Sequence, residues 1–159
     1  MAVSDSGTSG HYITASTPCF KKNRANHHIP ITLPNEYIIS STHIAILPQT
    51  NLPDAARRAH IFPHLTKPLI SIGTLCNNKC ITVFDTNQVT IYDIDTHQPV
   101  MTGQCNLVTT LYIINMTATP TIMTSPPLPD SFFAYHVYET KLNKTSYFFI
   151  ILFASTHPK

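Results

Sequence analysis

The chain has 159 residues, a formal net charge of +2 at pH 7 and 11 % charged side chains, less than half of the roughly 25 % usual in soluble domains. Thr (22 residues), Ser (11) and Pro (13) are abundant instead, which argues against a coiled coil or a helical bundle. A hydrophobic share of 43 % excludes a disordered tail, and the scattered basic residues do not indicate a nucleic-acid binder. We therefore expect an all-β fold.

Prolines interrupt the first seventy residues so often that few long helices can form there. Short apolar segments lie between them, at residues 29–33, 37–39 and 44–47. The first two flank Pro34-Asn35-Glu36, which predicts a hairpin turn. Residues 53–60 fit either a helix or the entry to a strand.

The second half of the chain alternates short apolar runs with turn residues, which predicts a sandwich or a small barrel. The expected strands cover residues 69–72, 80–84, 88–94, 99–102 and 111–114, with turns at residues 77–79 and 95–98. Residues 117–131 are rich in Pro and Thr and read as a linker, and residues 132–159 are aromatic-rich. We place a domain at residues 1–116.

Four cysteines are present, but the first residues have neither the charged start nor the apolar core of a signal peptide. The longest apolar run, residues 147–154, is too short to span a bilayer. The expectation is a soluble intracellular chain with free thiols and no membrane partner.

One triplet, Asp5-Ser6-Gly7, has a definite chemical use. A glycine permits a tight turn in which backbone N–H groups approach the carboxylate, and the hydroxyl can tie that turn to a partner loop. Two facing loops of this kind bring two carboxylates so close that they share one proton. The ionised carboxylate then activates a water, and the protonated one polarises a peptide carbonyl. On the triplet alone, a simple Asx or Ser turn is the favoured alternative.

The surrounding sequence adds a family resemblance. Residues 5–12 resemble the Asp-Ser-Gly-Ala/Thr-Ser/Thr-x-His signature of the protease in copia-type LTR retrotransposon Pol polyproteins. Residues 60–76 resemble that family's Val-Pro-x-Leu-x-x-Asn-Leu-Leu-Ser-Val segment, residues 80–84 its Val-x-Phe strand and residues 110–112 its Gly-Leu-Tyr. The resemblance covers about residues 1–115. It implies a retropepsin-like aspartic protease, whose fold is a small closed barrel of the acid-protease type.

The resemblance also implies roles for individual residues. Asp5 matches the catalytic aspartate, Ser6 the hydroxyl residue that locks two active-site loops together, and Gly7 the turn glycine. Residues 29–47 fall where a flap hairpin covers the bound peptide, and Leu69-Ile70 in the strand behind the Asp loop. The residues expected to bind substrate are Thr8, Asn35, Glu36 and Ile38.

The partners follow from the same resemblance. No second Asp-Ser/Thr-Gly exists in the chain, so a complete dyad requires a two-fold homodimer. The substrate is an extended polyprotein segment, bound as an added β-strand. The chemistry needs no cofactor and no metal, and neither nucleic acid nor membrane is an expected partner. The expected location is the cytoplasm, including virus-like particles.

The chain departs from the family pattern at three places. Only four residues precede Asp5, so we expect the domain to lack the family's upstream strands, and Pro68 stands where the family has Asn. Residues 132–159 resemble the start of a pre-integrase segment without its His and Cys ligands. The alternative function is therefore a catalytically inactive remnant or a non-catalytic β-domain.

Two other clusters of residues have weaker functional interpretations. His60 and His64 followed by Cys76 and Cys80 suggest a zinc site, but the apolar residues between the pairs favour a buried strand. Asp93 and Asp95 could mimic a carboxylate pair, and a solvated strand edge explains them better. We expect no metal site.

Overall fold

The computed structural model describes residues 1–116 and one short strand near the C-terminus. Strands dominate it and helix is scarce, which confirms the all-β class. The strands are β1 (Ala2–Asp5), β2 (His11–Ile13), β3 (Phe20–Arg24), β4 (Pro30–Thr32), β5 (Ile38–Ser40), β6 (His43–Ile46), β7 (Arg58–Ile61), β8 (Leu69–Ser71), β9 (Cys80–Phe84), β10 (Gln88–Asp93), β11 (Pro99–Asn106), β12 (Leu111–Ile114) and β13 (Leu152–Phe153). The helical elements are the 3-10 turn η1 (Asp54–Arg57) and helix α1 (Ile72–Asn77).

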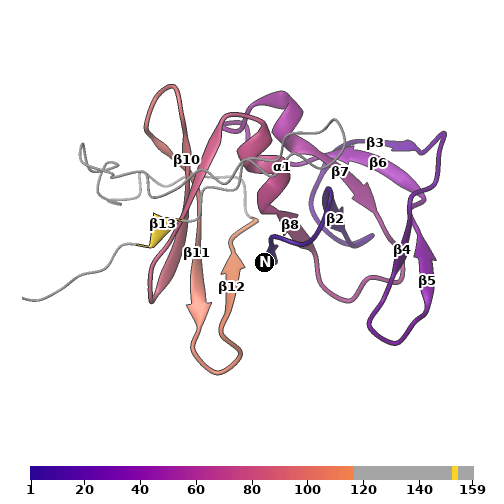
Figure 1. Cartoon of the computed structure of the whole chain (residues 1–159). Helices are drawn as coiled ribbons and strands as arrows, with labels where there is room; N and C mark the ends of the chain where they lie inside the picture. The colour runs from indigo at the N-terminus through magenta and orange to yellow at the C-terminus, as the bar shows by residue number, and fades with distance from the viewer. Residues whose placement is uncertain (117–151, 154–159) are drawn as a thin grey trace, which may run out of the picture.

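Eleven strands form one sheet in the order β13-β9-β10-β11-β12-β1-β8-β2-β7-β6-β3, and β4 and β5 form a separate hairpin. Figure 1 shows the meander β9–β12 on one side of the molecule and β2, β3, β6 and β7 on the other. The two ends of the sheet, β13 and β3, do not pair with each other in the described part of the chain. The closed barrel that we expected is therefore not found.

Strand β1 lies in the interior of the sheet, although it begins at the second residue. On one side it runs parallel to β8, with Asp5 opposite Ser71. On the other side it runs antiparallel to β12, with Ala2 opposite Ile114. Both edges of β1 are therefore paired, one with β8 and the other with β12.

The buried core draws on strands from both halves of the sheet and is mostly aliphatic. Its largest fully buried hydrophobic side chains are Phe62, Ile13, Leu47, Ile61, Ile70, Leu75, Ile91, Ile114, Met116 and Val89. β-Branched residues dominate that set because they fit the pleated surface of a half-buried strand. Many of the isoleucines of the chain therefore lie in the core.

Most of the predicted strands are confirmed. The hairpin around Pro34-Asn35-Glu36 is present as β4–β5, and the five strands predicted between residues 69 and 114 all appear. Four of them agree with the prediction within one residue at each end, whereas β11 continues to Asn106, four residues beyond its predicted end. Residues 53–60 contain both alternatives, a 3-10 turn followed by β7. All four cysteines are free thiols, as expected.

Two elements were not predicted. Residues 20–24, which carry three basic side chains, form the exposed edge strand β3. Residues 72–77 form helix α1, although Gly73 and Thr74 disfavour helix formation. Helix α1 forms nevertheless because Ser71 caps its first turn, accepting the N–H of Thr74 at 3.1 Å.

The predicted linker at residues 117–131 lies outside the described residues, as does the predicted pre-integrase-like segment at residues 132–159 apart from β13. Strand β13 runs parallel to β9, with Leu152 opposite Val83. Within the described residues, no helix has the length and apolar character needed to cross a membrane.

Gly103 gives a direct test of the packing between β11 and β12. A Cβ atom at this position would lie 2.5 Å from the carbonyl oxygen of Ile113 and 2.8 Å from the Cα of Ile114, both of them backbone atoms of β12. We expect Gly103→Ala to lower the free energy of unfolding by about 1–3 kcal/mol, because the two strands must separate. Urea denaturation followed by circular dichroism measures the change.

Gly73→Ala is the matched control. Its Cβ would come no closer than 3.8 Å to the hydroxyl of Ser71, and the residue lies in α1, where alanine is the better helix former by up to about 1 kcal/mol. This variant should be as stable as the wild type or more stable. A Gly103→Ala protein that unfolds at the wild-type urea concentration would contradict the described register.

Candidate active site

The Asp5 carboxylate lies in a tight turn at the end of β1. Its Oδ1 accepts the N–H of Gly7 at 2.7 Å, while Oδ2 has no hydrogen-bond partner among the described residues. A Cβ on Gly7 would come within 3.3 Å of Oδ1, which is tighter than an ordinary contact. Ser6 and Gly7 are exposed and Asp5 is half-buried. The turn thus fixes one carboxylate oxygen and presents the other, beside an exposed hydroxyl.

Strand β8 supports this turn from behind. It lies between β1 and β2, the two strands that the turn connects, and pairs with both of them. Its last residue, Ser71, donates its hydroxyl to the carbonyl of Thr8 at 2.6 Å. The same Ser71 oxygen accepts the N–H of Thr74 in α1. One side chain therefore joins the turn to the start of the helix.

His11 holds the far end of the turn. Its ring is fully buried, and Nε2 donates to the carbonyl of Ala56 at 2.8 Å while Nδ1 accepts the N–H of Ser71 at 3.0 Å. These two bonds assign the neutral ring with its proton on Nε2. Burial lowers the pKa of His11 to about 4, and the nearby His60 lowers it further by a smaller amount.

His11 and Ser71 are the residues that the sequence reasoning did not assign to the site. His11 belongs to the segment that resembles the family signature. Apart from that match, nothing in the sequence around His11 indicates that its ring is buried or bonded to the site. Ser71 stood within a predicted strand. A buried hydroxyl at a strand-to-helix junction is recognisable as a cap only once the helix is known.

The residues predicted to bind substrate lie in two places. Thr8 belongs to the Asp5 turn; its hydroxyl oxygen is buried and has no hydrogen-bond partner in the described part of the chain. Asn35, Glu36 and Ile38 lie on the β4–β5 hairpin, where Glu36 adopts a left-handed φ of 66° in the turn and Ile38 is 68 % exposed. Among the described residues no hydrogen bond or ion pair joins this hairpin to the Asp5 turn.

The competing carboxylates have structural roles. Asp93 accepts the backbone N–H groups of Asp95 and Thr96 and the hydroxyl of Thr96, and the Thr96 bonds in particular lower the pKa of Asp93. Asp95 forms an exposed ion pair with Lys79 at 2.8 Å. Asp93 thus closes the turn between β10 and β11, and Asp95 links that turn to Lys79, between α1 and β9.

The suggested zinc ligands do not assemble. Among the described residues, no group of three or more His, Cys, Asp or Glu side chains is placed to hold a metal ion. Burial raises the pKa of Cys80 to about 12, which leaves this thiol protonated and unreactive at neutral pH.

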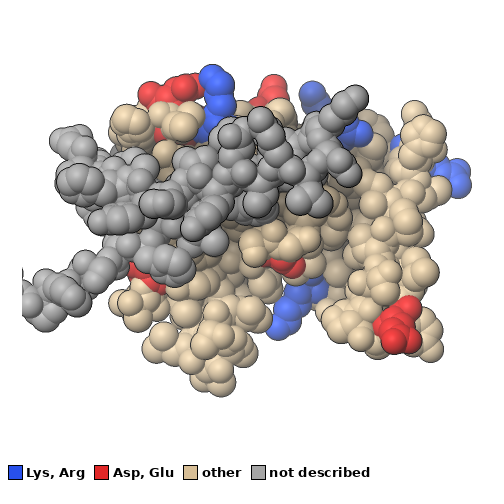
Figure 2. Space-filling view, in the orientation of Figure 1, with Lys and Arg blue, Asp and Glu red and all other residues tan. Residues whose placement is uncertain are grey.

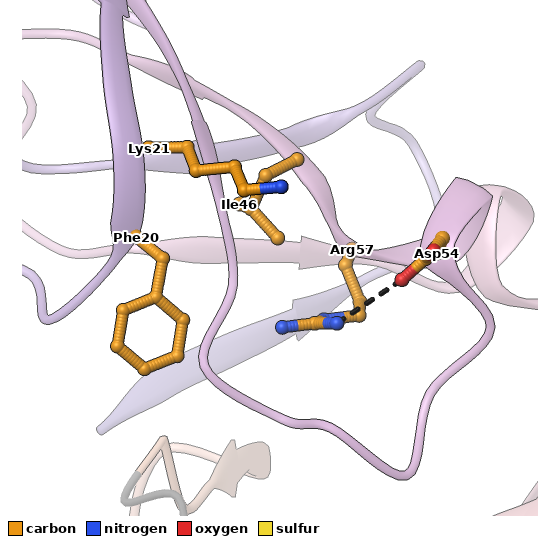
Figure 3. A pocket seen from close by; sticks show the side chains of 5 residues that line it. All are labelled: Phe20, Lys21, Ile46, Asp54 and Arg57. Atoms are coloured by element: carbon orange, nitrogen blue, oxygen red, sulfur yellow. Dashed lines mark hydrogen bonds and ion pairs between the residues drawn. The ribbon is translucent and has the colours of Figure 1, made fainter.

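A separate shallow pocket of about 340 Å³ lies between β3, β6 and η1, lined by Phe20, Lys21, Ile46, Asp54 and Arg57 (Figure 3). Arg57 donates from Nε to the carbonyl of Leu47 and from Nη1 to Asp54. The Arg57 guanidinium is therefore bonded to groups of the protein beside the pocket. None of the lining residues belongs to the Asp5 turn, so this pocket is distinct from the candidate active site.

Comparison with protein-family models, with curated proteins and with solved structures finds no match to this chain. The function must therefore be argued from the residues of the site and their geometry.

The buried His11 makes stability depend on pH. Its folded pKa of about 4 lies below the value of 6.5 of an exposed histidine, so the unfolded chain binds the proton more tightly. The contribution of the neutral His11 ring to the free energy of unfolding is complete above pH 6.5. It is lost as the pH falls toward 4, at about 1.4 kcal/mol per pH unit. We expect the free energy of unfolding to fall by up to roughly 3 kcal/mol across this window.

Urea denaturation at several pH values measures this slope. His11→Gln, which removes the titrating ring, should flatten the profile between pH 6.5 and 4, although it lowers stability at neutral pH by removing the Ser71 contact. His64→Gln, at an exposed position, is the control and should keep the wild-type slope. Equal slopes in the wild type and His11→Gln would rule out His11 as the titrating group.

Proposed function

We propose that this chain is a retropepsin-like aspartic endopeptidase of the copia-type retrotransposon class, active as a homodimer in which each copy supplies one Asp5. The single observation that carries this proposal is the Asp5–Gly7 turn, mounted on β1 and β2 with β8 paired between them. An isolated Asx turn would explain the bond from Gly7 to Asp5. It would not explain why a third strand and a buried histidine hold the turn in place.

The chemistry follows from the pairing of two such turns across a two-fold axis. Two carboxylates a few ångströms apart cannot both ionise, so they share one proton. The ionised Asp5 takes a proton from a water molecule whose oxygen attacks the peptide carbonyl carbon. The protonated Asp5 of the second copy gives its proton to the carbonyl oxygen, and a tetrahedral gem-diol forms.

The gem-diol then breaks down with the carboxylates in reversed roles. The carboxylate that took the water proton delivers it to the amide nitrogen, and the C–N bond breaks. The other carboxylate recovers its proton as the carbonyl reforms, so one peptide and one water yield a carboxylic acid and an amine. Gly7 donates to Oδ1 of Asp5, which fixes the orientation of the carboxylate.

The β4–β5 hairpin is the proposed flap over an extended peptide. It makes a sheet of its own, and Tyr37 and Ile38 in it are 71 % and 68 % exposed, which leaves apolar surface for a substrate side chain. Asn35 and Glu36 form its tip, and Thr8 lies beside the turn. An extended polyprotein segment suits this site because its backbone can pair as an additional strand.

Cleavage of a peptide library by the full chain tests this proposal. Asp5→Asn keeps the acceptor for the Gly7 N–H but removes the ionisable group, so we expect peptide cleavage to fall by at least about a hundredfold. Asp95→Asn is the matched control, an exposed carboxylate in another turn, and should keep full activity. Cleavage products are identified by mass spectrometry between pH 4 and 7.

Two results would overturn the proposal. Cleavage that is equal in the wild type and in Asp5→Asn would show that Asp5 is not the catalytic group. Absence of cleavage by the wild type at every pH, in a sample shown to be dimeric, would favour a non-catalytic β-domain or an inactive remnant.

A further inference from the structure

We infer that the pocket between β3, β6 and η1 binds a small organic anion, one that carries a carboxylate or phosphate group beside an aromatic ring. The pocket has a volume of about 340 Å³, which lies at the lower end of the range for small-molecule sites. Its walls provide two cationic side chains, Lys21 and Arg57, and two apolar ones, Phe20 and Ile46. None of them belongs to the Asp5 turn, so a ligand here does not depend on the proposed function.

Lys21 lines the pocket because β3 is irregular at this point. Neighbouring side chains of a regular strand point to opposite faces of the sheet, yet Phe20 and Lys21 both line the pocket. The pairing register between β3 and β6 shifts between Phe20 and Asn23, and Lys21 adopts a left-handed φ of 47°. This backbone conformation is costly for a residue with a Cβ, and such irregularities re-aim side chains at functional sites. The strain at Lys21 therefore indicates a use for its ammonium group in the pocket.

Arg57 is a second and more rigid cation in the same space. Its side chain is only 13 % exposed, and its Nε and Nη1 donate to the carbonyl of Leu47 and to Asp54 at 3.0 and 3.1 Å. Its Nη2 has no hydrogen-bond partner among the described residues. Figure 3 shows Asp54 on one side of the guanidinium and Phe20 and Lys21 on the other. Arg57 thus keeps donors for a ligand on a side chain that is already held in place, so little side-chain entropy is lost on binding.

The charge around the pocket favours an anion. The lining residues carry two positive charges and one negative charge, and the negative one, Asp54, already pairs with the arginine. Three further basic residues lie nearby in the sheet, Lys22 and Arg24 on β3 and Arg58 on β7. Figure 2 shows Lys and Arg atoms gathered at the upper right, where Figure 1 has β3. Such a surface attracts anions, and a carboxylate or a phosphate accepts charge-assisted hydrogen bonds from both lining cations.

The apolar walls define the rest of the ligand. Phe20 is 52 % exposed and Ile46 is half-buried, and the two residues lie opposite each other in the β3–β6 pair. An aromatic ring can pack against the Phe20 ring and cover Ile46, which removes apolar surface from water. An added β-strand suits this edge less well, because the irregular register interrupts the row of backbone groups with which it would pair. A small anion with a ring therefore fits both the charged and the apolar walls.

Titration of the full chain, followed by two-dimensional NMR, tests the inference with phenyl phosphate and phenylacetate as probes. We expect the tighter probe to bind with a Kd of about 1 mM or below and to shift the backbone resonances of Phe20, Lys21 and Arg57. Benzyl alcohol has the ring without the charge, and inorganic phosphate has the charge without the ring. Each of them should bind at least about tenfold more weakly than the tighter probe, whose head group identifies the preferred anion.

Two variants of Lys21 separate a specific contact from general charge attraction at about 0.15 M salt. Lys21→Met keeps the apolar stem and should raise the Kd of the tighter probe at least about tenfold, since the ammonium contact is lost. Lys21→Gly should weaken binding to the same extent and be at least as stable as the wild type, because glycine adopts a left-handed φ without strain. Lys22→Met is the matched control on the same strand, outside the pocket lining, and should keep the Kd within about twofold.

Four results would each overturn the inference. They are the absence of resonance shifts at the pocket with either probe at roughly 10 mM, wild-type affinity in the folded Lys21 variants, an equal loss of affinity in Lys22→Met, and equal binding of benzyl alcohol. Asp5→Asn should bind the tighter probe like the wild type, because its turn contributes no residue to the pocket. Failure of the protease proposal is therefore distinguishable from failure of this one.

Discussion

Strand β8 lies between the two strands that the Asp5 turn connects, and the rest of the candidate site depends on this insertion. It pairs in parallel with β1 and antiparallel with β2. The strands on either side of the turn are therefore both held by the same neighbour. Ile70 at its centre is fully buried, which anchors the strand to the core. The tertiary fold consequently sets the position of the turn, while the bond from Gly7 to Asp5 shapes the turn itself.

The polar contacts of this region join four elements through two side chains. His11 in β2 reaches the 3-10 turn η1 and the end of β8, and Ser71 reaches the Asp5 turn and α1. Each of these contacts satisfies a backbone group that is buried or lies at a helix terminus. A neutral histidine suits this role because it donates at one ring nitrogen and accepts at the other.

The sequence predicted the strands of the second half well, because residues 80–84 and 88–94 alternate clearly and are bounded by turn residues. It also located the Asp5 turn and the β4–β5 hairpin. It missed β3, whose Lys21, Lys22 and Arg24 resemble a solvated loop but protect an open sheet edge against pairing. The contacts of His11 could not be predicted from the sequence, because they link positions about 45 to 60 residues apart along the chain. The same holds for the bond from Ser71 to Thr8.

The low charge of the chain has a structural counterpart. Among the few acidic residues, Asp85 and Asp93 accept backbone N–H groups in the turns at either end of β10. The cluster of basic residues lies on β3 at the opposite end of the sheet order. Charge is thus placed at turns and at the exposed edge, and β11 and β12 themselves carry none.

The pairing of β1 with β12 joins Ala2 to Ile114, residues more than a hundred positions apart. During synthesis the first strand must therefore wait, unpaired on that side, until almost the whole described part of the chain has left the ribosome. Non-local pairs of this kind also slow folding, because the loop must close before the contact is made. Under the proposed endopeptidase function, this order of events would delay assembly of the Asp5 site until synthesis has passed β12.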